Sequence, residues 1–156
     1  MWRYRTSKYG NTKLDTPSGK FDSRLEYQHY LDLSLLQKGG KITRLNRQVR
    51  FKLGQSDKCK VHYVADFVYY DLTLEKWVVA DTKGMETTDF KIKLKWLLDS
   101  YDGFVFKLIF KRGEEFYEPF NETKRFVSEV VREHERKIYE KAMKGRFLRT
   151  SGDSAK

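Results

Sequence analysis

The sequence predicts an α/β protein in which helices flank a mixed central β-sheet. The chain has 156 residues, which is enough for one hydrophobic core but short for two independent ones. Segments with the period of a helix alternate with short β-branched and aromatic runs, in the order helix, three strands, helix, strand, helix. A helix between two strands is the connection that parallel strands require, whereas consecutive strands can pair as an antiparallel meander. We therefore expect one domain over residues 21–145, with an αβββαβ core and an extra C-terminal helix.

The first part of the chain divides into an arm and a helix. Residues 1–20 hold five basic side chains against one acid, with two glycines and a proline, and are predicted to form an irregular basic arm. Residues 21–36 are predicted to be a helix, because Ser23 and Glu26 have the spacing of a capping box and a pair of glycines follows. The apolar side of this helix is expected to carry Leu25, Leu33 and Leu36.

Three strands are predicted next. Residues 61–70 and 77–83 form the second and third, because both are rich in the residues that a half-buried sheet favours. A short polar connection joins these two strands, so they can pair with each other. The first strand spans residues 42–53, and basic residues recur on its outward-facing positions: Arg44, Arg47, Arg50 and Lys52.

The rest of the chain is predicted to hold two helices and one strand. Residues 104–110 are almost wholly apolar, as expected of a strand that is covered on both faces. A last helix is expected over about residues 122–144, followed by a flexible tail over residues 146–156. Before the strand, Thr87 can cap a helix that runs to about residue 101 and buries Phe90, Leu94, Leu97 and Leu98.

The composition favours a polyanionic partner. Lys and Arg number 32 against 22 Asp and Glu, which gives a net charge of +10. Such an excess is typical of proteins that bind nucleic acid, although many small proteins are basic for solubility alone. A single cysteine excludes an intrachain disulfide and a cysteine zinc site. No segment approaches the roughly 18 apolar residues of a spanning helix and no apolar signal region begins the chain, so we expect an intracellular, cytoplasmic protein without a membrane partner.

The residues with the clearest chemical meaning are Asp66, Asp81 and Lys83. Each aspartate ends an apolar β-run, and Lys83 follows Asp81 by two residues. Residues two apart in a strand point to the same face, so Asp81 and Lys83 project together. If the two strands pair, Asp66 lies beside them. Two carboxylates and an ammonium at the end of a sheet suit a hard divalent cation and a phosphate.

The ordered pattern resembles the PD-(D/E)xK nuclease superfamily and its restriction-endonuclease-like fold. The elements are Glu26 on the first helix, Asp66 on the second strand and the run from Asp81 to Lys83 on the third. Within the superfamily, the core over residues 21–111 is most similar to small phage endonucleases and Holliday-junction resolvases of the endonuclease I type. Segments around Glu26 and Asp66 also resemble an uncharacterised phage protein family assigned to this fold. The proline of the superfamily motif is replaced by Ala65.

The resemblance implies a magnesium-dependent DNA endonuclease in which Mn²⁺ substitutes for Mg²⁺. Asp66, Asp81 and the backbone carbonyl of Thr82 would suffice as protein ligands of one ion, because Mg²⁺ prefers oxygen ligands and keeps several waters. By resemblance, Glu26 completes the acidic cluster. Lys83 would orient the attacking water or stabilise developing negative charge.

Each of these residues also has an ordinary structural interpretation. Glu26 could serve only to close the capping box with Ser23. Asp66 could face solvent, although an acid inside an apolar strand costs free energy without a partner. Asp81 and Lys83 could form a surface ion pair. The four residues together favour a single site, because each of them lies at the position that such a site requires.

Further basic residues are candidates for contacts with the DNA backbone. The predicted contacts are Lys91, Lys93 and Lys95 on the second helix and Arg44, Arg47 and Arg50 on the first strand, although the lysines could equally be a solvated face. Gln48 is a further polar neighbour of the site, with weak support from the sequence.

Cleavage of branched or junction DNA follows from the family resemblance alone. A resolvase of this kind would act as a homodimer, and the last helix could supply the interface or pack on its own sheet. The alternative is a non-catalytic nucleic-acid-binding protein of a phage replication, recombination or packaging complex.

Overall fold

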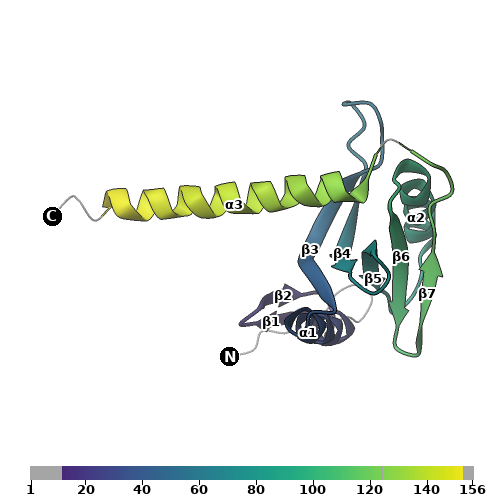
Figure 1. The fold of residues 1–156 in the computed structure, drawn as a ribbon, viewed down its shortest axis with the longest axis horizontal. Coiled ribbons are helices and arrows are strands. Elements are labelled where there is room, and N and C mark those ends of the chain that lie inside the picture. Colours follow the sequence, from purple (N-terminus) through teal and green to yellow (C-terminus); the bar gives the residue numbers. More distant parts are fainter. Residues whose placement is uncertain (1–11, 124, 153–156) are drawn as a thin grey trace.

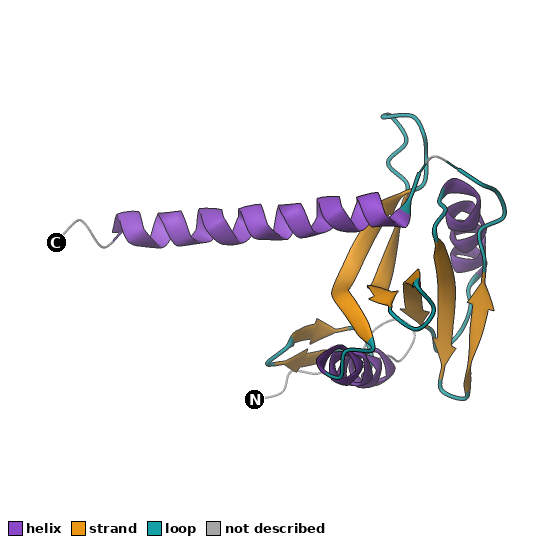
Figure 2. Ribbon diagram, viewed as in Figure 1, coloured by secondary structure: helices purple, strands orange, loops and turns teal. Residues whose placement is uncertain are grey.

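A five-stranded mixed sheet forms the centre of the protein (Figures 1 and 2). The structure is a computed structural model that describes residues 12–123 and 125–152. Neighbouring strands are antiparallel except for β5 and β6, which are parallel and are connected through helix α2 (Thr88–Ser100). The predicted α/β class and the order of its core elements are confirmed. Across the sheet, the strands are β3 (Ile42–Lys52), β4 (His62–Asp71), β5 (Lys76–Thr82), β6 (Phe104–Phe110) and β7 (Gly113–Tyr117).

Helices cover both faces of the sheet. Helix α1 (Arg24–Lys38) lies against one face, where its Leu33 packs with buried side chains of β3 to β6: Ile42, Phe67, Tyr69, Val78, Ala80, Val105 and Ile109. Helix α2 and the start of α3 (Val127–Gly152) cover the other face. As predicted, the buried residues of α2 are Phe90, Leu94, Leu97 and Leu98.

The prediction for the α1 stripe was only partly correct. Leu33 is buried, but Leu36 is 43% exposed and Leu25 is half-buried. The buried face of the helix instead carries Glu26, which is 1% exposed. Since hydrophobic spacing alone placed the stripe, a buried acid on the same face could not be expected from it.

The prediction of an irregular arm was wrong for residues 14–20, which form a β-hairpin together with Phe21, where the first helix was predicted to begin. Its turn places Gly19 at φ +111°, in the left-handed region that favours glycine. Phe21, at the end of the hairpin, is buried against two tyrosine rings of α1. The hairpin therefore docks on the domain. Its strands are β1 (Leu14–Thr16) and β2 (Gly19–Phe21), and the predicted arm before residue 12 lies outside the described residues.

The end of the chain also differs from the prediction. Strand β7 was not expected, because its short sequence is mostly polar and lies at an exposed edge of the sheet. Helix α3 begins at Val127 and continues to Gly152, so residues 146–152 are helical where a tail was predicted. Residues 153–156 lie outside the described part.

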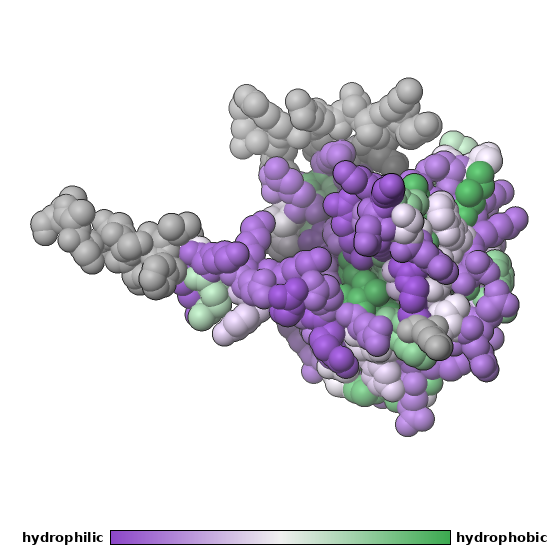
Figure 3. Space-filling model, turned by 90° about the horizontal axis from the view of Figure 1, so that it is seen from above, coloured by the Kyte–Doolittle hydropathy of each residue, from purple (hydrophilic) through white to green (hydrophobic). Residues whose placement is uncertain are grey.

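Helix α3 packs on the sheet only through its first turns and then projects from the domain (Figure 1). Val127 and Val131 are buried, whereas Ile138 and Tyr139, further along the helix, are 53% and 65% exposed. Ion pairs within the helix compensate its charges in solvent, joining Arg136 to Glu133 and Glu140 and Lys137 to Glu133. Where Figure 3 colours the projecting surface, it is mostly hydrophilic. No helix in the described part of the chain has the length and apolarity to cross a membrane.

Candidate active site

The ladder between β4 and β5 ends where the two predicted aspartates face each other. Its last regular pair is Phe67 with Ala80. At the next position the side chains replace the ladder: Oδ1 of Asp81 accepts the main-chain N–H of Asp66 at 3.1 Å. In return, Oδ2 of Asp66 accepts both the N–H and the hydroxyl of Thr82, each at 2.9 Å. The main-chain pairing of β4 with β5 therefore stops at these acids, and their carboxylates bridge the two strands there.

At Asp66, the side chains of β4 change the face of the sheet to which they point. Residues two apart in a regular strand share a face. Ala65, however, packs in the core under α2, whereas Phe67 packs in the core under α1. The same change occurs on β3, where Val49 lies under α2 and Leu45 packs under α1. This local twist lets Asp66 meet residues from both faces of the sheet.

Asp81 is held from the α2 side of the sheet and is 2% exposed. Its Oδ2 accepts the hydroxyl of Tyr63 at 2.7 Å and lies 2.9 Å from Nζ of Lys83. Burial, followed by the charge of Asp66, raises the pKa of Asp81 to about 7 in spite of these two partners. The pKa of Tyr63 is raised well above its ordinary value by burial and by Asp81, so the phenol stays a donor. Asp81 therefore has donors on both oxygens but no full compensation of its charge.

Lys83 lies at the wall of the site with its side chain 30% exposed. Its Nζ is 5.0 Å from the ring centre of Phe90, on the first turn of α2. Burial alone would lower the pKa of Lys83, but the charge and hydrogen bond of Asp81, then the charges of Asp66 and Glu26, raise it. The ammonium therefore remains charged and is fixed at the predicted position.

Glu26 approaches from α1 on the opposite face and combines its two predicted roles. The hydroxyl of Ser23 accepts the Glu26 N–H at 3.0 Å, and Oε2 of Glu26 accepts the N–H of Asp22 at 2.7 Å, one residue before the expected partner. Its other oxygen, Oε1, faces the site. Burial, followed by the charge of Asp66, raises the pKa of Glu26 to about 7, although Arg47 lies 3.7 Å away. Glu26 is therefore both a helix cap and a member of the acidic cluster.

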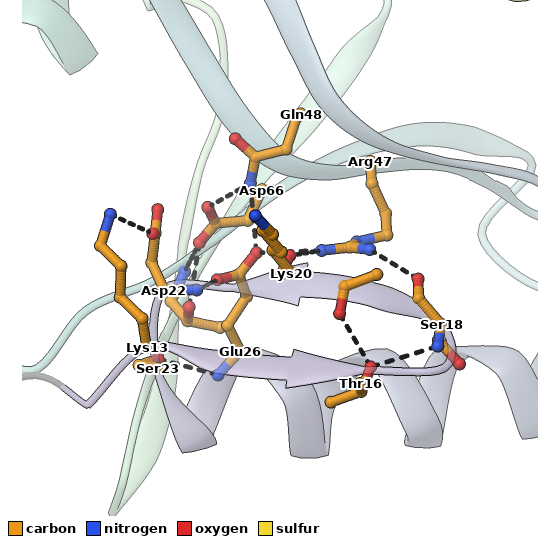
Figure 4. A network of polar contacts seen from close by, with 12 residues as sticks. Lys13, Thr16, Ser18, Lys20, Asp22, Ser23, Glu26, Arg47, Gln48 and Asp66 are labelled. Carbon is orange, nitrogen blue, oxygen red and sulfur yellow. Dashed lines mark hydrogen bonds and ion pairs between the residues drawn. The ribbon is translucent and has the colours of Figure 1, made fainter. Parts of the chain in front are cut away.

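Gln48 connects Glu26 to Asp66 (Figure 4). Its Nε2 lies 3.1 Å from Oε1 of Glu26 and 3.3 Å from Oδ1 of Asp66. The backbone of Gln48 has φ +52°, a left-handed conformation that is rare in a residue with a side chain. The available sequence signal was its polar side chain on an outward position of β3, but its register opposite Asp66 could not be known.

A pocket of about 510 Å³, which we call the acidic pocket, is lined by Asp22, Ser23, Glu26, Asp66, Thr82 and Lys83, while Asp81 lies buried behind it. Within the described residues, no three His, Cys, Asp or Glu side chains converge closely enough to form a ready-made metal site. The oxygens of Glu26 and Asp66 instead share the amide of Gln48. Even so, carboxylate oxygens are ligands that hard cations prefer, and two of the three acids have raised pKa values that a cation would lower. The donor set thus fits a hard divalent cation, provided that Gln48 moves or shares its position.

The predicted DNA contacts on β3 have different surroundings. Arg44 binds Glu135 of α3 through two nitrogens, at 3.1 and 2.6 Å, and so fastens α3 to the sheet. Arg47 stacks on Phe21 at 3.6 Å and donates to the carbonyls of Ser18 and Lys20, which holds the hairpin (Figure 4). Both arginines therefore have structural partners. Arg50 is exposed and has no ion pair with a described residue.

Two of the three α2 lysines that were predicted to contact DNA already form ion pairs. Lys91 pairs with Glu86 at 3.3 Å, and Lys93 pairs with Asp89 at the same distance. Lys95 is exposed and has no ion pair within the described parts of the chain. The structure thus brings the four predicted catalytic residues together but does not gather the six predicted DNA contacts into one surface.

A family model described as "Protein of unknown function (DUF1064)" matches residues 6–114, which span the hairpin, the acidic pocket and the strands up to the start of β7. The chain has no match among curated proteins or solved structures.

Proposed function

The chain belongs to the DUF1064 family, whose function is unknown, and we propose that it is a metal-dependent endonuclease that hydrolyses phosphodiester bonds in DNA. One observation carries the proposal: Glu26, Asp66, Asp81 and Lys83 meet where the main-chain pairing of β4 with β5 stops. The resemblance of their order to the PD-(D/E)xK pattern supplies the reaction. The proposed place of action is the cytoplasm, and the proposed origin is phage-type.

The residues that would hold Mg²⁺, or Mn²⁺ in its place, are Asp66, Asp81, Glu26 and the backbone carbonyl of Thr82. When bound, the ion lowers the pKa of a water and polarises a phosphate oxygen. The raised pKa values of Glu26 and Asp81 are consistent with this assignment, because burial and then the charge of Asp66 disfavour the ionised acids and a bound cation would favour them.

The remaining steps fall to side chains of the chain itself. Lys83, whose ammonium lies 2.9 Å from Asp81 at the edge of the pocket, would stabilise negative charge on the reacting phosphate. Tyr63 is a positioning residue, because its hydroxyl holds Oδ2 of Asp81. Gln48 is a second positioning residue, because its amide donates to both Glu26 and Asp66 and so joins the two carboxylates.

A non-catalytic nucleic-acid-binding protein is the second candidate, and one observation favours it. Both oxygens of Asp81 already accept hydrogen bonds, and the described residues contain no ready-made group of three metal ligands. In such a protein the acids would serve to end the ladder between β4 and β5.

Incubation of the protein with DNA distinguishes the two candidates. Supercoiled plasmid, a four-way junction and linear duplex are each mixed with the protein and Mg²⁺, Mn²⁺ or EDTA. We expect cleavage with either metal, none with EDTA, and a preference for the junction. Binding without cleavage under every metal condition, with a folded protein, would support the non-catalytic candidate instead.

The preference for branched DNA rests on the family resemblance and includes a homodimer, because two symmetric strands are cut. The proposed interface is the projecting part of α3, whose exposed apolar side chains include Ile138, Tyr139 and Met143. Light scattering coupled to size-exclusion chromatography gives the molecular mass in solution. A monomer at concentrations that support junction cleavage would exclude this interface.

A further inference from the structure

A second pocket of opposite charge adjoins the acidic one. It has a volume of about 570 Å³ and shares Ser23, Thr82, Lys83 and Gly84 with the acidic pocket. None of the described residues that line it is acidic. Its basic side chains are Arg24, Lys83, Lys111 and Arg112. We call this the basic pocket.

The fold explains why these cations lie together. Strands β5 and β6 are parallel, with Thr82 opposite Ile109, so the carboxyl ends of the two strands lie side by side. The N–H of Lys83 donates to the carbonyl of Ile109 at 2.9 Å, which holds the end of β5 close to the turn that follows β6. Lys111 and Arg112 form that turn, and Arg24 is the first residue of α1. Figure 1 shows α1 and the turn between β6 and β7 at the same end of the molecule.

Three of these cations are not paired with an acid of the described residues. Arg24, Lys111 and Arg112 are exposed, and none of them forms an ion pair with a described residue. This distinguishes them from Arg44, whose guanidinium is occupied by Glu135. Like charges around one hollow repel each other, and an anion that lies among them relieves this repulsion.

We propose that the basic pocket binds phosphate groups of a nucleic-acid strand, next to the phosphate that is cleaved at the acidic pocket. This inference rests on the proposed function and adds the surface that holds the substrate. Lys83 lies on the boundary between the two pockets, so a strand that follows the basic pocket passes from Lys111 and Arg112 to the acids. The surface differs from the lysines of α2 and the arginines of β3 that the sequence favoured.

The test is a double substitution in the exposed turn, Lys111→Ala with Arg112→Ala, in the full chain. Binding of fluorescent duplex and four-way junction is measured by anisotropy in EDTA, so that no cleavage occurs, at several salt concentrations. Each lost phosphate contact lowers the slope of log affinity against log salt by about 0.9. We therefore expect the slope to fall by about 2 and the affinity at physiological salt to fall roughly tenfold.

The matched control is Lys58→Ala with Lys60→Ala. These two exposed lysines lie in the loop between β3 and β4 and form no ion pair with a described residue. The loop is at the other end of the sheet from α1 (Figure 1). The control removes the same charge, so we expect its affinity and slope to stay close to those of the wild type. Circular dichroism of all variants verifies the fold.

The outcomes separate this inference from the proposed function. Equal losses in the two variants would mean a general effect of net charge, and no loss in the turn variant would exclude the basic pocket; either result overturns the inference. If the turn variant alone loses affinity but the wild type cleaves no DNA with Mg²⁺ or Mn²⁺, the basic pocket stands and the endonuclease proposal fails. If the wild type cleaves DNA and the turn variant binds normally, the endonuclease proposal stands and the basic pocket fails.

Discussion

The main-chain N–H of Asp66 donates to the carboxylate of Asp81 at 3.1 Å, one position beyond the last regular pair of β4 and β5. The bond joins two acids without placing their four oxygens together, because it uses one acid's backbone and the other's side chain. Each carboxylate keeps a separate role: Asp66 faces Gln48 and Thr82, and Asp81 faces Tyr63 and Lys83.

Substitution of Asp81 by Asn is expected to abolish cleavage while DNA binding persists. An amide keeps the shape of the side chain and still accepts the N–H of Asp66, but it is a poor ligand for a hard cation. Plasmid nicking with Mg²⁺ should fall below detection, and anisotropy should give an unchanged affinity in EDTA. A folded D81N protein that nicks at the wild-type rate would remove Asp81 from the reaction.

Substitution of Lys83 by Ala is expected to lower the turnover rate by about 10²–10³, the scale for loss of one electrostatic donor. Lys83→Arg should restore the rate only in part, because a planar guanidinium does not replace a compact charge beside a metal. The loss of DNA affinity should be much smaller than the loss of rate, since one phosphate contact among several contributes little. Single-turnover rates at saturating protein measure the chemical step. A normal rate there, with strongly weakened binding, would make Lys83 a docking residue only.

The unfolding free energy is expected to fall as pH rises from about 4.5 to about 7 in EDTA. The pKa of Glu26 is raised from 4.5 to about 7 in the folded protein, so the folded state binds more protons than the unfolded state across this window. The protonated Glu26 contributes its full stabilisation below pH 4.5, and this contribution is lost above about pH 7. The unfolding free energy falls by on the order of 3 kcal/mol from this group. Urea unfolding at several pH values measures the fall.

Two further measurements test the cause of this pH dependence. Glu26→Gln should reduce the fall and leave the part that Asp81 contributes, whereas Glu122→Gln, at an exposed glutamate, should leave the shape of the curve unchanged. Mg²⁺ should stabilise the wild type more at high pH than at low pH, because it binds the ionised acids. A curve for the Glu26 variant that parallels the wild type would show that Glu26 titrates normally.

Gly is expected to be better tolerated than Ala at position 48. Gln48 has φ +52°, and the left-handed conformation costs about 1 kcal/mol or more for a residue with a Cβ but little for Gly. Both variants lose the amide that joins Glu26 and Asp66, so their difference isolates the backbone strain. Urea unfolding should therefore show Gln48→Gly to be more stable than Gln48→Ala by about 1 kcal/mol.

Arg50 supplies the control, because it lies two residues further along β3 and its backbone is not left-handed. There the order should be reversed, with Arg50→Ala more stable than Arg50→Gly by roughly 0.5–1 kcal/mol. The same order of Ala and Gly at both positions would contradict the assignment of strain to Gln48.

The sequence could predict the parts of the fold and site that depend on short-range periodicity. The two-residue repeat placed Asp81 with Lys83, the short connection between β4 and β5 predicted that Asp66 lies beside them, and capping spacing placed Glu26 at the start of α1. Whether these residues cut DNA remains a prediction, because geometry alone does not establish a reaction.

What the sequence could not predict depends on register and on packing across the sheet. A shift in the pairing of β3 with β4 lies between Thr43 and Asn46, and the position of Gln48 opposite Asp66 follows from it. Ion pairs such as Arg44 with Glu135 join residues far apart in the chain, so no local pattern shows that the arginine is occupied. The basic pocket likewise required knowing that β5 and β6 end together.

The exchange of hydrogen bonds at the end of β4 and β5 gives each aspartate two reasons to be retained. An apolar substitution at Asp66 or Asp81 would leave main-chain N–H groups without acceptors and shorten the sheet, whether or not a reaction is lost. If the proposed endonuclease activity holds, a descendant that no longer cuts DNA would still be selected to keep both acids for its fold. Lys83 does not accept any of these main-chain bonds, so evolution is freer to change it, and its loss in a relative would be the earlier sign of abandoned catalysis.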